Sequence, residues 1–248
     1  MGTESMSDSQ SREADPASAR EDDWKAKWRD WLDIAATVVL ALATILTAWS
    51  AFQSAKWSGL QTVAFSEASA ARTESARAAN LAGQQAQVDI GVFLDWLSAA
   101  DSDIRNGLIE LPTSGDTYQP TEGTLSGFIF ERTREEFRPA LRAWLDTEPL
   151  RVSDAPATPF DMPEYQLEAM AQADAFLTTA EARGEDARNN NQQSDNYVLM
   201  AVVFASVLFF VGLSSKLPNP KSGLAILIVG IVLFIGAAAT VLTFPIEV

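Results

Sequence analysis

The sequence predicts an all-α integral membrane protein with three transmembrane helices, in which spans 1 and 2 extend into a long antiparallel helical hairpin stalk capped by a small helical region. Three stretches without a charged residue carry this prediction, at 34–52, 197–215 and 224–246. A helix rises about 1.5 Å per residue, so about 20 residues cross a hydrocarbon core roughly 30 Å thick. The alternative, buried helices of a soluble core, fits poorly with three such stretches in 248 residues.

The chain before the first span is polar and acidic. Residues 1–21 contain few side chains able to form a core, which predicts a disordered acidic N-terminal tail. An interfacial start and the first transmembrane helix then occupy 22–52. A secretory signal has a short basic start and a shorter apolar stretch, so we expect this segment to be an uncleaved anchor.

Tryptophans mark the ends of the first span. Indole rings prefer the boundary between water and lipid, where the ring is apolar and the N–H stays hydrated. The spacing of the first three (i, i+4, i+7) predicts a helix that begins near Asp22 and turns an aromatic face to the bilayer. The other interpretation is a tryptophan stripe packed on protein. The predicted interface anchors are Trp24, Trp28, Trp31, Trp49 and Trp57.

Residues 53–97 are predicted to continue the first span as an extramembrane stalk helix. Small or apolar residues recur there at a mean step of about 3.6, and no proline interrupts them. The predicted contact face comprises Trp57, Leu60, Ala64, Ala68, Ala71, Ser75, Ala79, Ala82, Ala86, Ile90, Phe93 and Leu97.

Residues 163–196 are predicted to be the returning stalk helix, which enters the second transmembrane helix at 197–215. The polar run "NNNQQ" at 189–193 then forms the membrane-proximal turns of a helix, and the alternative is a flexible linker, because Asn and Gly184 weaken helices. Small residues let two helices approach closely, which favours an antiparallel coiled coil. The predicted stalk-packing residues are Ala64, Ala68, Ala71, Ala79, Ala82, Ala173, Ala180 and Ala187.

Residues 98–162 are predicted to form a small helical and irregular cap. The turn-rich segment "LPTSGDTYQPTEG" is typical of a loop, and 124–145 reads as one helix or two, with Pro139 in a first turn. We expect the aromatic side chains of this region to pack onto Phe93, Trp96 and Leu97. A short loop at 216–223 then leads to the third transmembrane helix at 224–246.

Basic residues near the span ends predict the orientation. Lys and Arg are enriched in cytoplasmic segments, counted close to the membrane. The N-terminus and the 216–223 loop are therefore expected in the cytoplasm, with residues 53–196 and the tail "FPIEV" outside. The basic residues that decide this are Lys25, Lys27, Arg29, Lys216 and Lys221.

Composition excludes several functional classes. Residues 53–196 hold 11 Lys and Arg against 23 Asp and Glu, a net charge of −12 out of the chain's −15, so no nucleic-acid partner is expected. Without His or Cys, the chain has none of the usual zinc, haem or iron–sulfur ligands and no Ser–His or Cys nucleophile system. We predict no enzyme and no catalytic, cofactor-binding or metal residues. The carboxylates of "REE" at 134–136 and "EDD" at 21–23 are typical of solvated helix surfaces.

Hydroxyl side chains raise the question of a pore. No Asp, Glu, Lys or Arg lies within a predicted span, whereas coupled transporters place charged groups there. One arc of the first helix carries hydroxyls that would line a hydrated path or contact a neighbouring helix. The alternative is that each hydroxyl bonds to a carbonyl one turn earlier. These candidate pore-facing or helix-contact residues are Thr37, Thr44, Thr47 and Ser54.

Four segments carry a further signal: "AWSAFQSAKWSGLQ", "RPALRAWL", "PFDMPEY" and "DNYVLMAVVFASVLFFVGLSSK". Together they resemble a family of uncharacterised three-span bacterial membrane proteins with an Ala-rich helical extramembrane region. The resemblance implies a multi-pass protein of the bacterial cytoplasmic membrane. It supplies no catalytic residue to carry over.

These observations predict a non-enzymatic membrane protein that presents a helical stalk as a self-associating scaffold or a partner-binding module. Its expected partners are the lipid bilayer, further copies of itself and an unidentified protein at the stalk or cap. The alternative is a homo-oligomeric ion channel with the first transmembrane helix lining the path and the acidic region gathering cations.

Overall fold

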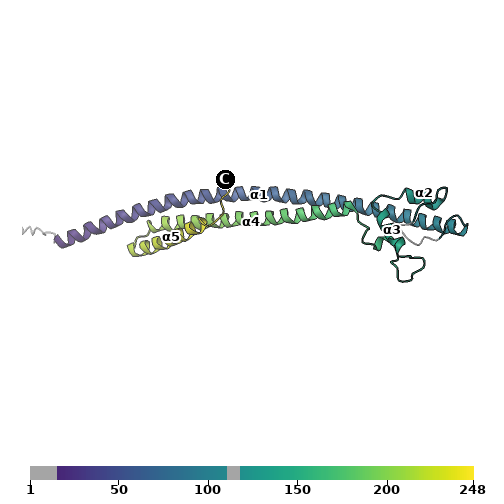
Figure 1. Ribbon diagram of the computed structural model, residues 1–248. Helices are drawn as coiled ribbons and strands as arrows, with labels where there is room; N and C mark the ends of the chain where they lie inside the picture. The colour runs from purple at the N-terminus through teal and green to yellow at the C-terminus, as the bar shows by residue number, and fades with distance from the viewer. Residues whose placement is uncertain (1–15, 111–117) are drawn as a thin grey trace, which may run out of the picture. The chain divides into compact units, whose positions relative to one another are not determined.

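The computed structural model describes residues 16–110 and 118–248 (Figure 1). Within these ranges the regular elements are helices, without a strand. They form two compact units, which we call the span unit (Met1–Thr62 with Ala187–Val248) and the cap unit (Val63–Asp186). The helices are α1 (Pro16–Arg105), α2 (Leu125–Glu131), α3 (Arg138–Asp146), the 3-10 helix η1 (Pro159–Asp161), α4 (Glu168–Ser214) and α5 (Pro220–Val241).

Helix α1 runs for 90 residues without interruption. No proline lies between Pro16 and Pro112, so every intervening residue can donate a helical hydrogen bond. The helix begins at Pro16, where a fixed φ suits a first turn, and not near Asp22 as predicted. Of the predicted disordered tail, residues 1–15 lie outside the described part and residues 16–21 are helical.

The C-terminal end of α1 lies at Arg105, eight residues beyond the predicted end at 97. Gly107 stops the helix with a φ of 70°, in the left-handed region that glycine adopts without strain. Its N–H donates to the Ile104 carbonyl at 3.0 Å, and the Leu108 N–H donates to the Asp103 carbonyl at 2.9 Å. This pair of bonds satisfies carbonyls that would otherwise be unpaired at the helix end.

Helix α4 contains the polar run at 189–193 within its 47 residues. The alternative of a flexible linker is therefore wrong. The helix begins at Glu168, five residues later than the start predicted at 163. Polar side chains interact along it at helical spacing, since Asn191 Nδ2 donates to Asp195 Oδ2 and Gln192 Nε2 donates to Asn196 Oδ1, each at 3.1 Å.

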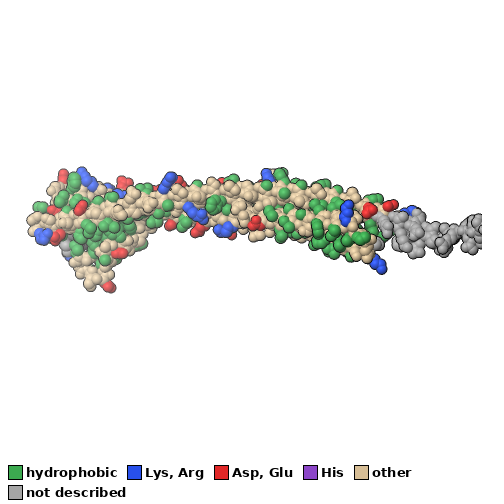
Figure 2. All heavy atoms as spheres, turned by 180° about the vertical axis from the view of Figure 1, so that it is seen from behind, with side chains coloured by type: hydrophobic (Ala, Val, Ile, Leu, Met, Phe, Trp, Pro, Cys, Tyr) green, Lys and Arg blue, Asp and Glu red, His purple; other side chains and the backbone are tan. Residues whose placement is uncertain are grey.

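Three helices are long and apolar enough to cross a membrane. They lie within Asp30–Arg105, Glu168–Ser214 and Lys221–Val241, and their most apolar windows have mean hydropathies of 2.0, 2.4 and 2.8. Hydrophobic side chains cover much of the surface around α5 on the face shown in Figure 2. In length and composition these helices match those of membrane proteins.

The span unit packs the N-terminal half of α1, the C-terminal part of α4 and α5 together. Two buried clusters hold it: one is built around Val207 and Val211, the other around Tyr197 and Phe204. Gly230 brings α5 close to α4, because a Cβ atom at this position would lie 2.6 Å from Cγ2 of Val211. The small residue thus sets the distance between these helices.

The cap unit has an aromatic core built on the last turns of α1. Phe93 and Trp96 are buried against side chains of α2 and α3, as expected, and Leu97 packs at the edge. The prediction of one or two helices in 124–145 is confirmed as α2 and α3, with Pro139 in the first turn of α3. The remaining buried core residues are Ala100, Phe130, Phe137, Ala140, Leu141, Trp144 and Leu145.

Candidate functional sites

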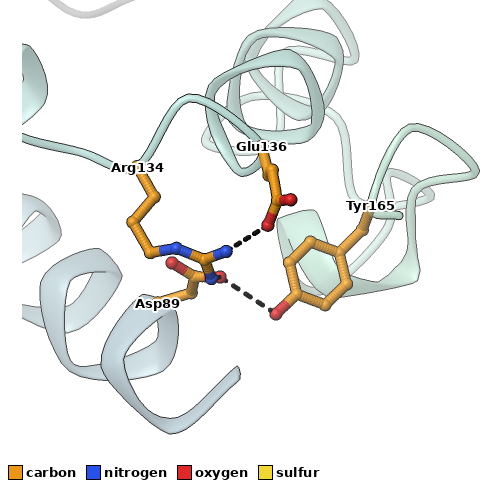
Figure 3. A network of polar contacts seen from close by, with 4 residues as sticks. All are labelled: Asp89, Arg134, Glu136 and Tyr165. Carbon is orange, nitrogen blue, oxygen red and sulfur yellow. Dashed lines mark hydrogen bonds and ion pairs between the residues drawn. The ribbon is translucent and has the colours of Figure 1, made fainter. Parts of the chain in front are cut away.

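A buried carboxylate lies at the centre of the cap unit. Asp89 of α1 is 1% exposed, and its Oδ2 accepts two hydrogen bonds (Figure 3). Arg134 Nη1, from the connection between α2 and α3, donates at 2.9 Å, and the Tyr165 hydroxyl, from the segment before α4, donates at 3.2 Å. Arg134 also forms an ion pair with Glu136 through its other terminal nitrogen. One carboxylate thus joins three separate segments of the chain.

The electrostatics of this network are dominated by burial. Loss of hydration raises the pKa of Asp89 above its ordinary value, and the neighbouring Arg134 guanidinium only partly offsets this. Burial, and then the adjacent Asp89 carboxylate, raise the pKa of Tyr165 to about 12. The Tyr165 phenol therefore stays protonated at neutral pH and remains a hydrogen-bond donor to Asp89.

A cavity in the cap unit is lined by residues other than those of the Asp89 network. This cavity of about 580 Å³ is lined by Glu135, Arg138, Arg142, Asp146 and Glu164 with neighbouring apolar atoms. Asp89 is buried and accepts hydrogen bonds from Arg134 and Tyr165, so the carboxylate holds these two segments against α1.

Sequence reasoning missed Asp89. The predicted contact face of α1 passed through Ile90, which is 44% exposed, whereas Asp89 beside it is buried. A signal was present, because Asp89 follows Ala82 by seven residues and precedes Phe93 by four, and both are buried on the same face. A charge at such a position predicts a buried partner.

The "REE" segment divides between two environments. Arg134 and Glu136 belong to the Asp89 network, whereas Glu135 lines the neighbouring cavity. The expectation that the two carboxylates lie on a solvated surface fits Glu135, which is exposed, whereas Glu136 is half-buried and paired with Arg134. The side chains of "EDD" at 21–23 lie outside the described residues.

A second group of buried polar side chains lies in the span unit, just beyond the first predicted span. The hydroxyls of Ser54 on α1 and Ser194 on α4 are 3.0 Å apart, and Ser194 also donates to the Ser54 carbonyl. Gln53 bonds to the backbone of Glu247, and the Tyr197 hydroxyl donates to the Pro245 carbonyl. The C-terminal segment thus meets α1 and α4 through polar contacts.

The threonines of the predicted hydroxyl arc bond to their own helix. Thr37, Thr44 and Thr47 donate to carbonyls four residues earlier, at 2.8, 2.8 and 2.7 Å. Ser54 instead pairs with Ser194 of the neighbouring helix. The three threonine bonds match the alternative interpretation, in which each hydroxyl bonds to a carbonyl one turn earlier. A hydroxyl bonded in this way can still face water.

The predicted packing alanines lie largely inside their units. Ala79 is half-buried, and the others are buried: Ala64, Ala68, Ala71, Ala82, Ala173, Ala180 and Ala187. In the cap unit, the Ser75 hydroxyl of α1 donates to the Ala173 carbonyl of α4 at 2.9 Å, which requires close approach of the two backbones. Arg183 of α4 pairs with Glu67 of α1 at 3.1 Å.

The tryptophans at the span ends differ in exposure. Trp28, Trp31 and Trp49 are exposed on the protein surface, as rings that contact lipid headgroups would be. Trp57 is half-buried and packs against the cluster around Tyr197. The side chain of Trp24 lies outside the described ones.

Among the side chains that the structure describes, no group of three or more acidic residues is placed to hold a metal ion. Comparisons with protein-family models, curated proteins and solved structures found no match. The resemblance to three-span bacterial membrane proteins therefore stays a prediction, and the functional argument rests on the contacts described above.

Proposed function

We propose that the chain is a non-enzymatic integral membrane protein that self-associates or holds a protein partner through a helical stalk and its cap. The observation that carries this proposal is the continuity of α1 and α4. Each passes from an apolar, membrane-length segment into a polar segment without a break. A helix that leaves the bilayer in this way presents its polar part at a distance from the lipid.

Contacts between α1 and α4 support an antiparallel hairpin. In the span unit Ser54 meets Ser194, and in the cap unit Ser75 meets Ala173. Within the cap unit, α1 runs from Glu67 to Ser75 while the residues paired with them on α4 run back from Arg183 to Ala173. Small side chains at such a contact let two antiparallel helices approach closely.

The chemistry of the cap unit supports a binding rather than a catalytic role. Its buried carboxylate is occupied by Arg134 and Tyr165, and its large cavity is lined by mixed surface charges. Hydrogen-bonded networks of this kind fix the position of side chains and rigidify a unit. A rigid cap suits recognition of a further copy or of another protein.

We place the protein in the bacterial cytoplasmic membrane, with the N-terminus and the 216–223 loop in the cytoplasm and residues 53–196 outside. The contact between Gln53 and Glu247 supports a shared side for the end of the first span and the C-terminal segment. The orientation itself rests on the Lys and Arg near the span ends.

Native mass spectrometry of the protein in lipid nanodiscs tests self-association. We expect a defined oligomer that persists at low protein concentration. A monomer under all conditions would exclude the self-associating scaffold and leave only capture of another protein. A ring of about four or more copies with ion flux in liposomes would instead favour the channel, since helices need several copies to enclose a path.

A further inference from the structure

Gln53 makes an unusual contact for a helix side chain at the edge of an apolar span. It is fully buried, its Nε2 donates to the Glu247 carbonyl at 3.0 Å, and its Oε1 accepts from the Glu247 N–H at 3.0 Å. One primary amide thus satisfies both backbone groups of one residue, as a neighbouring β-strand does. Both hydrogen bonds are made to the backbone of Glu247, and neither involves its side chain.

Tyr197 of α4 extends this contact along the same segment. Its buried hydroxyl donates to the Pro245 carbonyl at 3.0 Å, and its ring meets Phe244 edge to face at a centroid distance of 5.4 Å. Pro245 has no N–H, so no donor is left unpaired at that position. Residues 244–247 are therefore bound by one aromatic contact and three hydrogen bonds.

We propose that Gln53 and Tyr197 form a binding site for an extended peptide segment, which the chain's own residues 244–247 occupy as a clasp. The clasp fixes the C-terminal end of α5 against α1 and α4, because Phe244 lies three residues beyond the end of α5 and packs in the cluster around Tyr197. This inference goes beyond the proposed stalk function and does not depend on it.

The side-chain chemistry at position 53 is restrictive. A carboxylate would only accept hydrogen bonds and would leave the Glu247 carbonyl without a donor, and an aliphatic side chain would leave both backbone groups unpaired. Buried polar groups without partners are costly, so the segment should detach when the amide is lost. Tyr197→Phe removes a single donor and keeps the ring against Phe244, which makes it the milder variant.

Spin-label mobility measures whether the clasp is closed. Val248 is fully exposed, so a label on Val248→Cys reports the motion of the adjacent clasped residue without entering the site. We expect an immobilised spectrum in the parent protein, a mobile one with Gln53→Leu and an intermediate one with Tyr197→Phe. Gln84→Leu, the same change at an exposed position of α1, should leave the spectrum unchanged.

A labelled "FPIEV" peptide tests the site in trans, on protein stopped after Thr243 in nanodiscs. Two lost hydrogen bonds should weaken its binding by roughly tenfold in the Gln53→Leu background. Equal binding in both backgrounds would mean partition into lipid and would overturn the site. A Val248 label equally mobile in the parent and in Tyr197→Phe protein would overturn the clasp, even if Gln53→Leu failed to fold.

Discussion

At the scale of single residues, Asp89 is a buried polar group that connects distant parts of the cap unit. Two donors from distant parts of the chain meet one of its oxygens, and burial still raises its pKa. Desolvation of the carboxylate therefore outweighs the attraction of Arg134. A buried carboxylate of this kind determines which segments pack against one another more than it increases the free energy of unfolding.

Asp89→Asn tests this balance through the pH dependence of stability. A raised pKa in the folded state means that the folded cap unit binds the proton more tightly than the unfolded chain does. The stability contributed by protonation is present at low pH and is lost as pH rises through the folded-state pKa. The free energy of unfolding of Asp89→Asn, relative to the parent, should therefore rise with pH across that interval.

Chemical unfolding followed by tryptophan fluorescence at several pH values would measure this difference, since Trp96 and Trp144 lie in the same core. The same measurement on Asp95→Asn, an exposed position of the same helix, controls for the loss of one carboxylate. A difference that falls with pH for Asp89→Asn would contradict the raised pKa.

At the scale of the elements, small residues decide how closely helices pack. Gly230 and Gly236 lie on the same helix, α5, yet only Gly230 faces another helix closely. The sequence did not predict which of the two glycines lies at a helix contact, because their spacing of six residues does not match the GxxxG packing pattern. Gly230 differs from Gly236 because Val211 of α4 lies beside it.

Gly230→Ala should destabilise the span unit. The new Cβ atom would meet Val211, whose branched side chain has little freedom to move, and overpacking of this kind costs about 1–3 kcal/mol. Gly236→Ala meets nothing within 4 Å and should be neutral or stabilising, since alanine favours a helix. Thermal unfolding in detergent compares the two, and equal melting temperatures would contradict the close approach at Gly230.

Cross-linking tests the pairing of α1 and α4. The chain has no cysteine, and the hydroxyls of Ser54 and Ser194 are 3.0 Å apart, close enough for a disulfide between cysteines at these positions. Ser54→Cys with Ser194→Cys should oxidise within one chain, seen as a faster band on a non-reducing gel. Thr62→Cys with Ser194→Cys should not, because Thr62 is exposed and lies about 12 Å further along α1. Cross-links only between chains would contradict the intramolecular hairpin.

At the scale of the whole molecule, the chain has three helices able to span a bilayer and a separate, acidic cap unit. The two units bury different sets of side chains. The span unit buries apolar side chains of three helices, and the cap unit buries an aromatic core joined by the Asp89 network. The acidic composition of the cap unit is typical of a solvated protein surface.

Thiol labelling in intact cells tests the orientation. Ser153 is exposed in the cap unit, and Ser222 is exposed at the start of α5. With residues 53–196 outside, an impermeant maleimide should label Ser153→Cys in intact cells and Ser222→Cys only after permeabilisation. The reverse pattern would place the cap unit in the cytoplasm.

The sequence by itself determined the helical class and the three apolar segments, because charge-free runs of this length and a 3.6-residue period are local properties. It also predicted that "NNNQQ" is helical and that aromatic residues pack onto Phe93 and Trp96. Only the tertiary structure decided the partners of Asp89, the close approach at Gly230 and the binding of residue 247 by Gln53. Each of these joins residues far apart in the chain, and a periodic pattern shows which face is buried but not what lies opposite it.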